Sequence, residues 1–128
     1  MGGRQVPAIR GVYEVALPVR ELARAETFYR DVLGLEVGLR DETRRWLFLR
    51  AGGPDGMVVL QEDPEGWSSL HVAFTVRDED LDRAVAALRE RGVDVDGPVT
   101  HDWMPARSAY FSDPDGHALE LCAPLPGD

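Results

Sequence analysis

Residues 13–20 read Tyr-Glu-Val-Ala-Leu-Pro-Val-Arg, and residues 70–77 read Leu-His-Val-Ala-Phe-Thr-Val-Arg. The second stretch repeats the first, and His71 stands at the position of Glu14. Two further stretches recur in the same order: residues 34–37 as 92–95, and residues 54–56 as 114–116. A chain that repeats itself over most of its length indicates a duplicated structural unit.

Each copy of the repeat predicts one helix and four strands. Side chains alternate between two faces over residues 12–19 and again over 70–76, which is typical of strands. Apolar residues then recur at spacings of three and four, which predicts amphipathic helices that end before a glycine. The helices are expected over 22–33 (before Gly34) and 81–88 (before Gly92), and the remaining strands over 35–39, 46–50, 57–61, 93–95, 108–111 and 117–122. Each half therefore has the order β-α-β-β-β.

Composition restricts the classes of function. A length of 128 residues fits one domain, expected over 1–128 with repeats at about 11–63 and 69–123. A single cysteine, Cys122, excludes an intrachain disulfide, and the lack of lysine excludes a lysine Schiff base. The formal charge of −9 argues against a nucleic-acid partner. No long apolar run or signal-peptide core is present, so we expect a cytoplasmic protein without a membrane partner.

Glu14, His71 and Glu120 are candidate ligands of a divalent metal ion. Strand alternation places each of them opposite the apolar side chains that should pack against a helix, among mostly small neighbours. A carboxylate in such a hollow is costly unless a positive charge compensates it. A single strand histidine or glutamate is more often structural or exposed. The repeat is what favours the metal site, because it puts Glu14 and His71 at equivalent points.

Three segments carry a resemblance to a known family: residues 15–19, residues 28–35 (Phe-Tyr-Arg-Asp-Val-Leu-Gly-Leu) and residues 110–121, which contain Asp-Pro-Asp-Gly. Over residues 11–123 the chain resembles the vicinal oxygen chelate superfamily, which includes glyoxalase I, fosfomycin-resistance thiol transferases, extradiol dioxygenases and bleomycin-resistance proteins. The resemblance implies an α+β fold in which two tandem βαβββ modules form an open, cupped eight-stranded mixed β-sheet with helices on the outside. It also implies a homodimer.

The resemblance assigns the metal positions residue by residue. In this superfamily the ligands come from the first and last strands of each unit, which match Glu14, Leu60, His71 and Glu120 here. Leu60 cannot bind a metal, so the resemblance implies three ligands, and Gln61 is expected on the opposite face. Glu14 and Glu120 are then the candidate catalytic carboxylates, and the ion would be Ni, Zn, Mn or Fe. The three ligands could belong to one chain, or Glu14 could come from another.

Two functions stay open at this point. The first is a metal-dependent enzyme acting on a small oxygen-chelating substrate, by isomerase or lyase chemistry, thiol transfer or oxygenation. The second is a bleomycin-resistance-type protein that sequesters a ligand without catalysis. Arg107, which could hold an anionic group, and His101 and Trp103, on the loop before it, are the candidate substrate-binding residues.

Overall fold

The computed structural model describes residues 12–53, 56–65, 69–102 and 105–125. The first half contains β1 (Glu14–Val19), α1 (Leu22–Glu26), its continuation η2 (Thr27–Val32), β2 (Glu36–Asp41), β3 (Trp46–Arg50) and β4 (Met57–Glu62). The second half contains β5 (His71–Thr75), α2 (Asp78–Glu90), β6 (Asp96–Thr100), β7 (Ala106–Ser112) and β8 (Ala118–Pro124). The predicted α+β class and the two βαβββ modules are confirmed.

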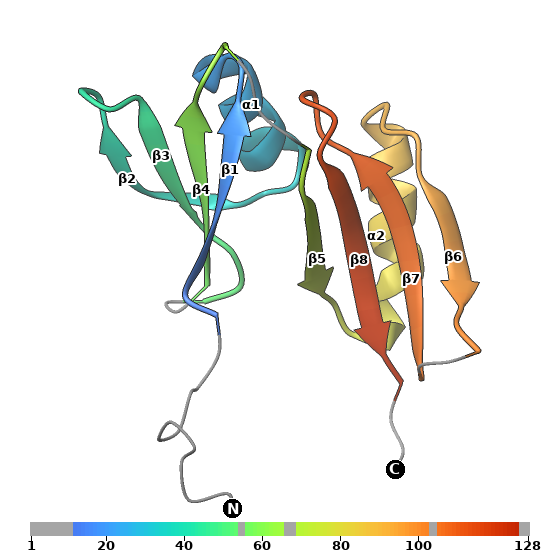
Figure 1. Ribbon diagram of the computed structural model, residues 1–128. Helices are drawn as coiled ribbons and strands as arrows, with labels where there is room; N and C mark the ends of the chain where they lie inside the picture. Colours follow the sequence, from blue (N-terminus) through green and yellow to red (C-terminus); the bar gives the residue numbers. More distant parts are fainter. Residues whose placement is uncertain (1–11, 54–55, 66–68, 103–104, 126–128) are drawn as a thin grey trace, which may run out of the picture.

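The eight strands divide into two four-stranded mixed sheets with the same topology. The strand order is β1-β4-β3-β2 in one sheet and β5-β8-β7-β6 in the other. In each sheet the first strand runs parallel to the last, and the other pairs are antiparallel. The sheets stand side by side with β1 and β5 at neighbouring edges (Figure 1). A cavity of about 580 Å³, lined by residues of both strands, lies between these edges.

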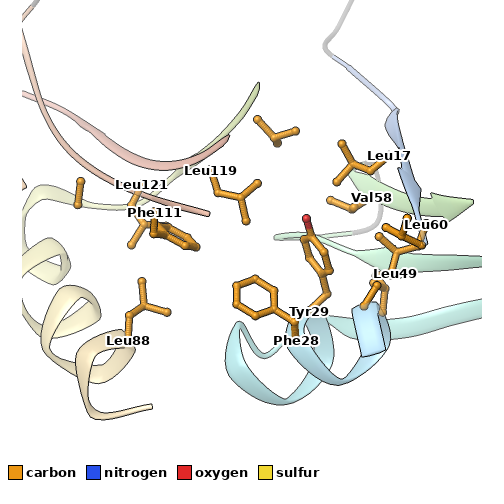
Figure 2. Packing of buried hydrophobic residues seen from close by; sticks show 14 of the residues in the cluster. Leu17, Phe28, Tyr29, Leu49, Val58, Leu60, Leu88, Phe111, Leu119 and Leu121 are labelled. Carbon is orange, nitrogen blue, oxygen red and sulfur yellow. The ribbon is translucent and has the colours of Figure 1, made fainter. Parts of the chain in front are cut away.

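Each sheet has one face against the core and one open face. Val72 of β5 belongs to the core and Phe74 packs against it, whereas His71 and Ala73, which alternate with them along the strand, are exposed. The core-facing side chains of both modules form one hydrophobic cluster. Figure 2 shows Phe28 and Tyr29 between Leu17, Leu49, Val58 and Leu60 of the first module and Leu88, Phe111, Leu119 and Leu121 of the second. The two open faces are therefore turned away from a shared core.

The loop between β7 and β8 fastens the second module to the first. The buried Tyr29 hydroxyl donates to Asp113 Oδ2 at 2.7 Å. The backbone N–H of Arg20 and the guanidinium of Arg24 both donate to Asp115 Oδ1 at 2.9 Å. The sequence indicates only a turn at these residues. In the folded chain, the aspartates of this turn bind residues of the first module and hold the two modules together.

The first helix differs from the expected one in its winding, and the segment after the second helix is not the expected strand. The last turns of the first helix form a π-helix, in which the Leu33 N–H donates to the Phe28 carbonyl five residues earlier. Gly34 and Gly92 have positive φ angles of 80° and 83°, which confirms them as helix stops. The strand predicted at 93–95 is wrong, because Val93 still bonds to the end of α2 and pairing with β7 begins at Asp96.

The strand register corrects one sequence match. Ala16 pairs with Val59 in the first sheet, and Ala73 pairs with Glu120 in the second. Val59, and not Leu60, therefore occupies the position related to Glu120. The mismatch arises because β8 begins two residues after Gly116 whereas β4 begins one residue after Gly56. Strand alternation consequently places Gln61 on the open face with Val59, contrary to expectation.

No helix in the described ranges is long and apolar enough to cross a membrane.

Candidate functional site

His71 and Glu120 meet on the open face of the second sheet. The register pairs His71 with Ala118 and Ala73 with Glu120, so the two side chains are diagonal neighbours on adjacent parallel strands. Their atoms Nε2 and Oε1 are 2.9 Å apart. The His71 side chain is 56% exposed and the Glu120 side chain only 10%. The sheet thus brings together two of the three predicted metal ligands and leaves the pair accessible from outside.

The spacing of this pair fits two ligands of one ion. Imidazole nitrogen and carboxylate oxygen atoms each bind a metal at about 2.1 Å, so two such ligands at a right angle are separated by about 3 Å. The observed separation of 2.9 Å is the length of an ordinary hydrogen bond between the two groups, and it is also close to this value. Among the described residues, however, no group of three or more His, Cys, Asp or Glu side chains could hold a metal ion. The described part of one chain therefore brings together two candidate ligands and not the predicted three.

Glu14 lies on the other sheet. It is the first residue of β1, it is exposed, and it lines the cavity between the β1 and β5 edges. Within the described part of the chain Glu14 does not join His71 and Glu120, which belong to the second sheet. In the described part of the chain, β1 and β5 each pair with a strand on one side only. Such edges carry unpaired backbone groups that another chain can cover.

A hydrogen-bonded network supports Glu120 from the side of β7. The Ser108 hydroxyl donates to Glu120 Oε2 at 2.7 Å. Nε2 of His101 lies 3.0 Å from Ser108 Oγ and 3.1 Å from the Tyr110 hydroxyl oxygen. Sequence reasoning missed Ser108 and Tyr110. They could have been predicted from the sequence, because strand alternation over 106–112 puts both polar side chains on one face.

Arg107 points to the opposite face of the same strand. Its Nε donates to Asp78 Oδ1 at 2.7 Å, and its Nη1 lies 3.5 Å from Asp82 Oδ1 on α2. The hydrogen bond to Asp78 raises the pKa of the Arg107 guanidinium above its ordinary value. The structure thus ties this predicted substrate-binding residue to a helix, away from His71 and Glu120. Trp103, the other loop candidate besides His101, lies outside the described residues.

The fold and the pair of His71 and Glu120 agree with one class of protein. The model of the Glyoxalase/Bleomycin resistance protein/Dioxygenase superfamily matches residues 11–121. The chain therefore belongs to this superfamily, as its repeated βαβββ modules and the residue pair on the open face lead one to expect.

Three relatives cover most of the chain. The metallothiol transferase FosB of Staphylococcus epidermidis is 32% identical over 119 residues, which cover 88% of this chain and 83% of FosB. An integron cassette protein from the mobile metagenome of the Halifax Harbour sewage outfall is 48% identical, with a TM-score of 0.87 over 90% of this chain and 99% of that one. TnmS3, an antibiotic binding protein from Streptomyces sp. CB03234, is 34% identical, with a TM-score of 0.77 over 91% and 98%.

Proposed function

We propose that the protein is a metal-dependent enzyme of this superfamily and works as a cytoplasmic homodimer. In this proposal His71 and Glu120 of one subunit bind a divalent ion together with Glu14 of the second subunit. The observation that carries it is the 2.9 Å approach of His71 Nε2 and Glu120 Oε1 on an accessible sheet face. The two side chains already form a hydrogen bond there, and both are residue types that bind divalent ions.

In this proposal the dimer supplies the third metal ligand to each pair of His71 and Glu120. Glu14 belongs to the first sheet and the pair to the second, and within the described part of one chain the three side chains form no common cluster. A two-fold symmetric dimer would place the first module of each chain against the second module of its partner and create two equal sites. The edges of β1 and β5, which in the described part of one chain each pair with a strand on one side only, favour such an arrangement.

The ligand set determines the chemistry of the site. Two carboxylates and one imidazole suit Mn, Fe, Ni or Zn, and three protein ligands leave positions open to a substrate. When bound, the ion would polarise a substrate that offers two neighbouring oxygen atoms. His71 and Glu120 serve to hold the ion. Glu14, which is exposed, is the candidate for accepting a proton as well.

Thiol transfer is the reaction to test first. The relative FosB is named a metallothiol transferase and matches most of both chains at 32% identity. In such a reaction a thiolate sulfur forms a bond to a substrate carbon while a carbon–oxygen bond breaks, and the released oxygen takes up a proton. Isomerase or lyase chemistry on a comparable oxygen-rich substrate is the alternative within the enzyme class.

Metal content tests the site directly. Elemental mass spectrometry of tag-free protein, reloaded separately with Mn²⁺, Ni²⁺, Zn²⁺ and anaerobic Fe²⁺, is expected to find nearly one ion per chain. His71→Ala and Glu14→Ala should each lose it. Glu36→Ala is the matched control, because Glu36 is an exposed glutamate on the same sheet as Glu14. A wild-type protein that binds none of the four ions would refute the proposal.

A product assay tests the reaction. Metal-loaded protein is incubated with fosfomycin and either glutathione or L-cysteine, and the adduct is sought by mass spectrometry. Thiol transfer is supported if an adduct forms with the wild type and not with His71→Ala. A stoichiometric ion without any adduct would retain the metal site and remove thiol transfer to this substrate.

The second candidate function is sequestration of a ligand without catalysis. It is favoured by the 34% identity to TnmS3, which is named an antibiotic binding protein. Trp46 and Phe48 of β3 also form an aromatic pair with ring centroids 6.4 Å apart. Titration of metal-free protein with bleomycin, followed by tryptophan fluorescence, tests this function. Saturable quenching by protein that binds no metal would favour sequestration over catalysis.

A further inference from the structure

Glu120 is held at both of its carboxylate oxygens by different partners. Oε1 faces His71 Nε2 at 2.9 Å, and Oε2 accepts the Ser108 hydroxyl at 2.7 Å. Ser108 has no exposed surface, and Glu120 has little. Water therefore has poor access to replace Ser108 at Oε2. Rotation of the carboxylate about its last bond would break both contacts at once.

The donors and acceptors in this network can be assigned one after another. An ionised carboxylate only accepts, so the single hydroxyl proton of Ser108 goes to Glu120. The Ser108 oxygen can then only accept from His101, which places a proton on His101 Nε2. The same N–H also lies 3.1 Å from the Tyr110 oxygen. His101 is thus a donor that orients the Ser108 hydroxyl toward Glu120.

We infer that Ser108 and His101 are positioning residues, which hold Glu120 so that Oε1 stays directed at the open face beside His71. An ion bound by Nε2 and Oε1 would replace the direct contact of His71 with Glu120. Of the two contacts at the carboxylate, only that with Ser108 would remain. Partners of this kind typically change metal affinity by 10- to 100-fold. The metal-affinity part of the inference rests on the proposed function, whereas the orientation of Glu120 does not.

The experiment uses two pairs of variants in the full chain. Ser108→Ala removes the hydroxyl, and Ser112→Ala is its matched control, because Ser112 is an exposed serine at the end of the same strand. His101→Phe removes the N–H donor, and His101→Gln keeps one at this partly exposed position. Zn²⁺ affinity is measured by competition with a chromophoric chelator. Crystal structures of the metal-free wild type and Ser108→Ala show the orientation of Glu120.

We expect Ser108→Ala to bind Zn²⁺ about 10- to 100-fold more weakly, with the Glu120 carboxylate turned. His101→Phe should weaken binding several-fold, and Ser112→Ala and His101→Gln should resemble the wild type. Unchanged affinity and an unchanged Glu120 in Ser108→Ala would overturn the inference. If the wild type binds no metal, the proposed function fails. The crystal structures still test whether Ser108 positions the Glu120 carboxylate. A turned carboxylate supports the positioning role, and an unchanged one refutes it.

Discussion

The ring of His117 joins the two modules: its Nε2 donates to the carbonyl oxygen of Pro18, 2.6 Å away and 99 residues earlier. On the other side of the ring, Nδ1 accepts the Leu70 N–H at 2.9 Å. A neutral imidazole with its proton on Nε2 satisfies both bonds. The side chain is completely buried. The histidine nearest in sequence to the predicted ligand Glu120 is therefore a structural bridge.

Replacement of His117 by Phe is expected to lower the free energy of unfolding by about 1–4 kcal/mol, because the buried ring makes two partly buried hydrogen bonds to the backbone, and both are lost. Urea unfolding measures this loss. His71→Phe is the matched control, since the same exchange at an exposed side chain should cost less than about 1 kcal/mol. Equal effects of the two substitutions would contradict the bridging role of His117.

Tyr29 makes stability depend on alkaline pH. Burial raises the pKa of its phenol far above the ordinary range, and the neighbouring Asp113 raises it further. A raised pKa in the folded state stabilises the protein below the unfolded value of about 10 and ceases to do so as the pH rises above it. Tyr29→Phe should lose about 1–3 kcal/mol at neutral pH and depend less on pH above about 10.

Tyr13→Phe is the control for this measurement, because Tyr13 is 60% exposed. Urea midpoints between neutral pH and pH 11 compare the three proteins. A wild type and a Tyr29→Phe variant with parallel alkaline profiles would rule out a contribution from this phenol.

Glu26 should contribute to the loss of folding stability at acidic pH. Arg40 donates to both of its carboxylate oxygens, at 2.9 and 2.8 Å, and this pairing lowers the pKa of Glu26. A lowered pKa stabilises the fold above the unfolded value of about 4.3, and the contribution is lost as the pH falls below it. Glu26→Gln is expected to be about 1–3 kcal/mol less stable at pH 7.

The acid limb of the Glu26→Gln profile should accordingly be flatter than that of the wild type between about pH 5 and 2. The exposed Glu36, changed to Gln, provides the comparison. Thermal unfolding at a series of pH values makes the measurement. If Glu26→Gln and Glu36→Gln share one profile, Glu26 is not the titrating group.

Mixed dimers distinguish a shared metal site from one within a chain. Glu14→Ala and His71→Ala subunits are each unable to bind metal alone. If the site is shared, random reassociation of equal amounts gives heterodimers with one intact site, so that about a quarter of the wild-type metal returns. Elemental mass spectrometry after unfolding and refolding of the mixture measures it. No recovery in verified heterodimers would exclude the shared site.

Arg107 should contribute to stability and not to ligand binding. Its ion pairs with Asp78 and Asp82 are partly exposed, so Arg107→Ala is expected to lower the urea midpoint only slightly. Metal content and bleomycin binding should stay at the wild-type level. Arg83→Ala, at an exposed arginine of α2, should have a smaller effect. Loss of bleomycin binding at unchanged stability would instead restore the substrate-binding role predicted from the sequence.

Much of the local structure was predictable from particular residues. Alternation over 13–20 and 70–77 assigns both strands and their two faces, because side chains along a strand point to opposite sides in turn. Gly34 and Gly92 mark the helix ends, because glycine adopts positive φ at little cost. The convergence of His71 and Glu120 also agrees with the prediction, since it needs only two adjacent strands of one module.

The remaining features depend on contacts between distant parts of the chain. The extra residue before β8 shifts the match from Leu60 to Val59, and only the pairing of strands reveals it. The wide turns of η2 place Phe28 and Tyr29 between two sheets, which local periodicity does not predict. The sequence by itself determined the repeated modules, their faces and the candidate ligands, because these depend on short-range backbone geometry. Tertiary structure decided the register, the bridge through His117 and the separation of Glu14 from His71, because these depend on how two modules share one core.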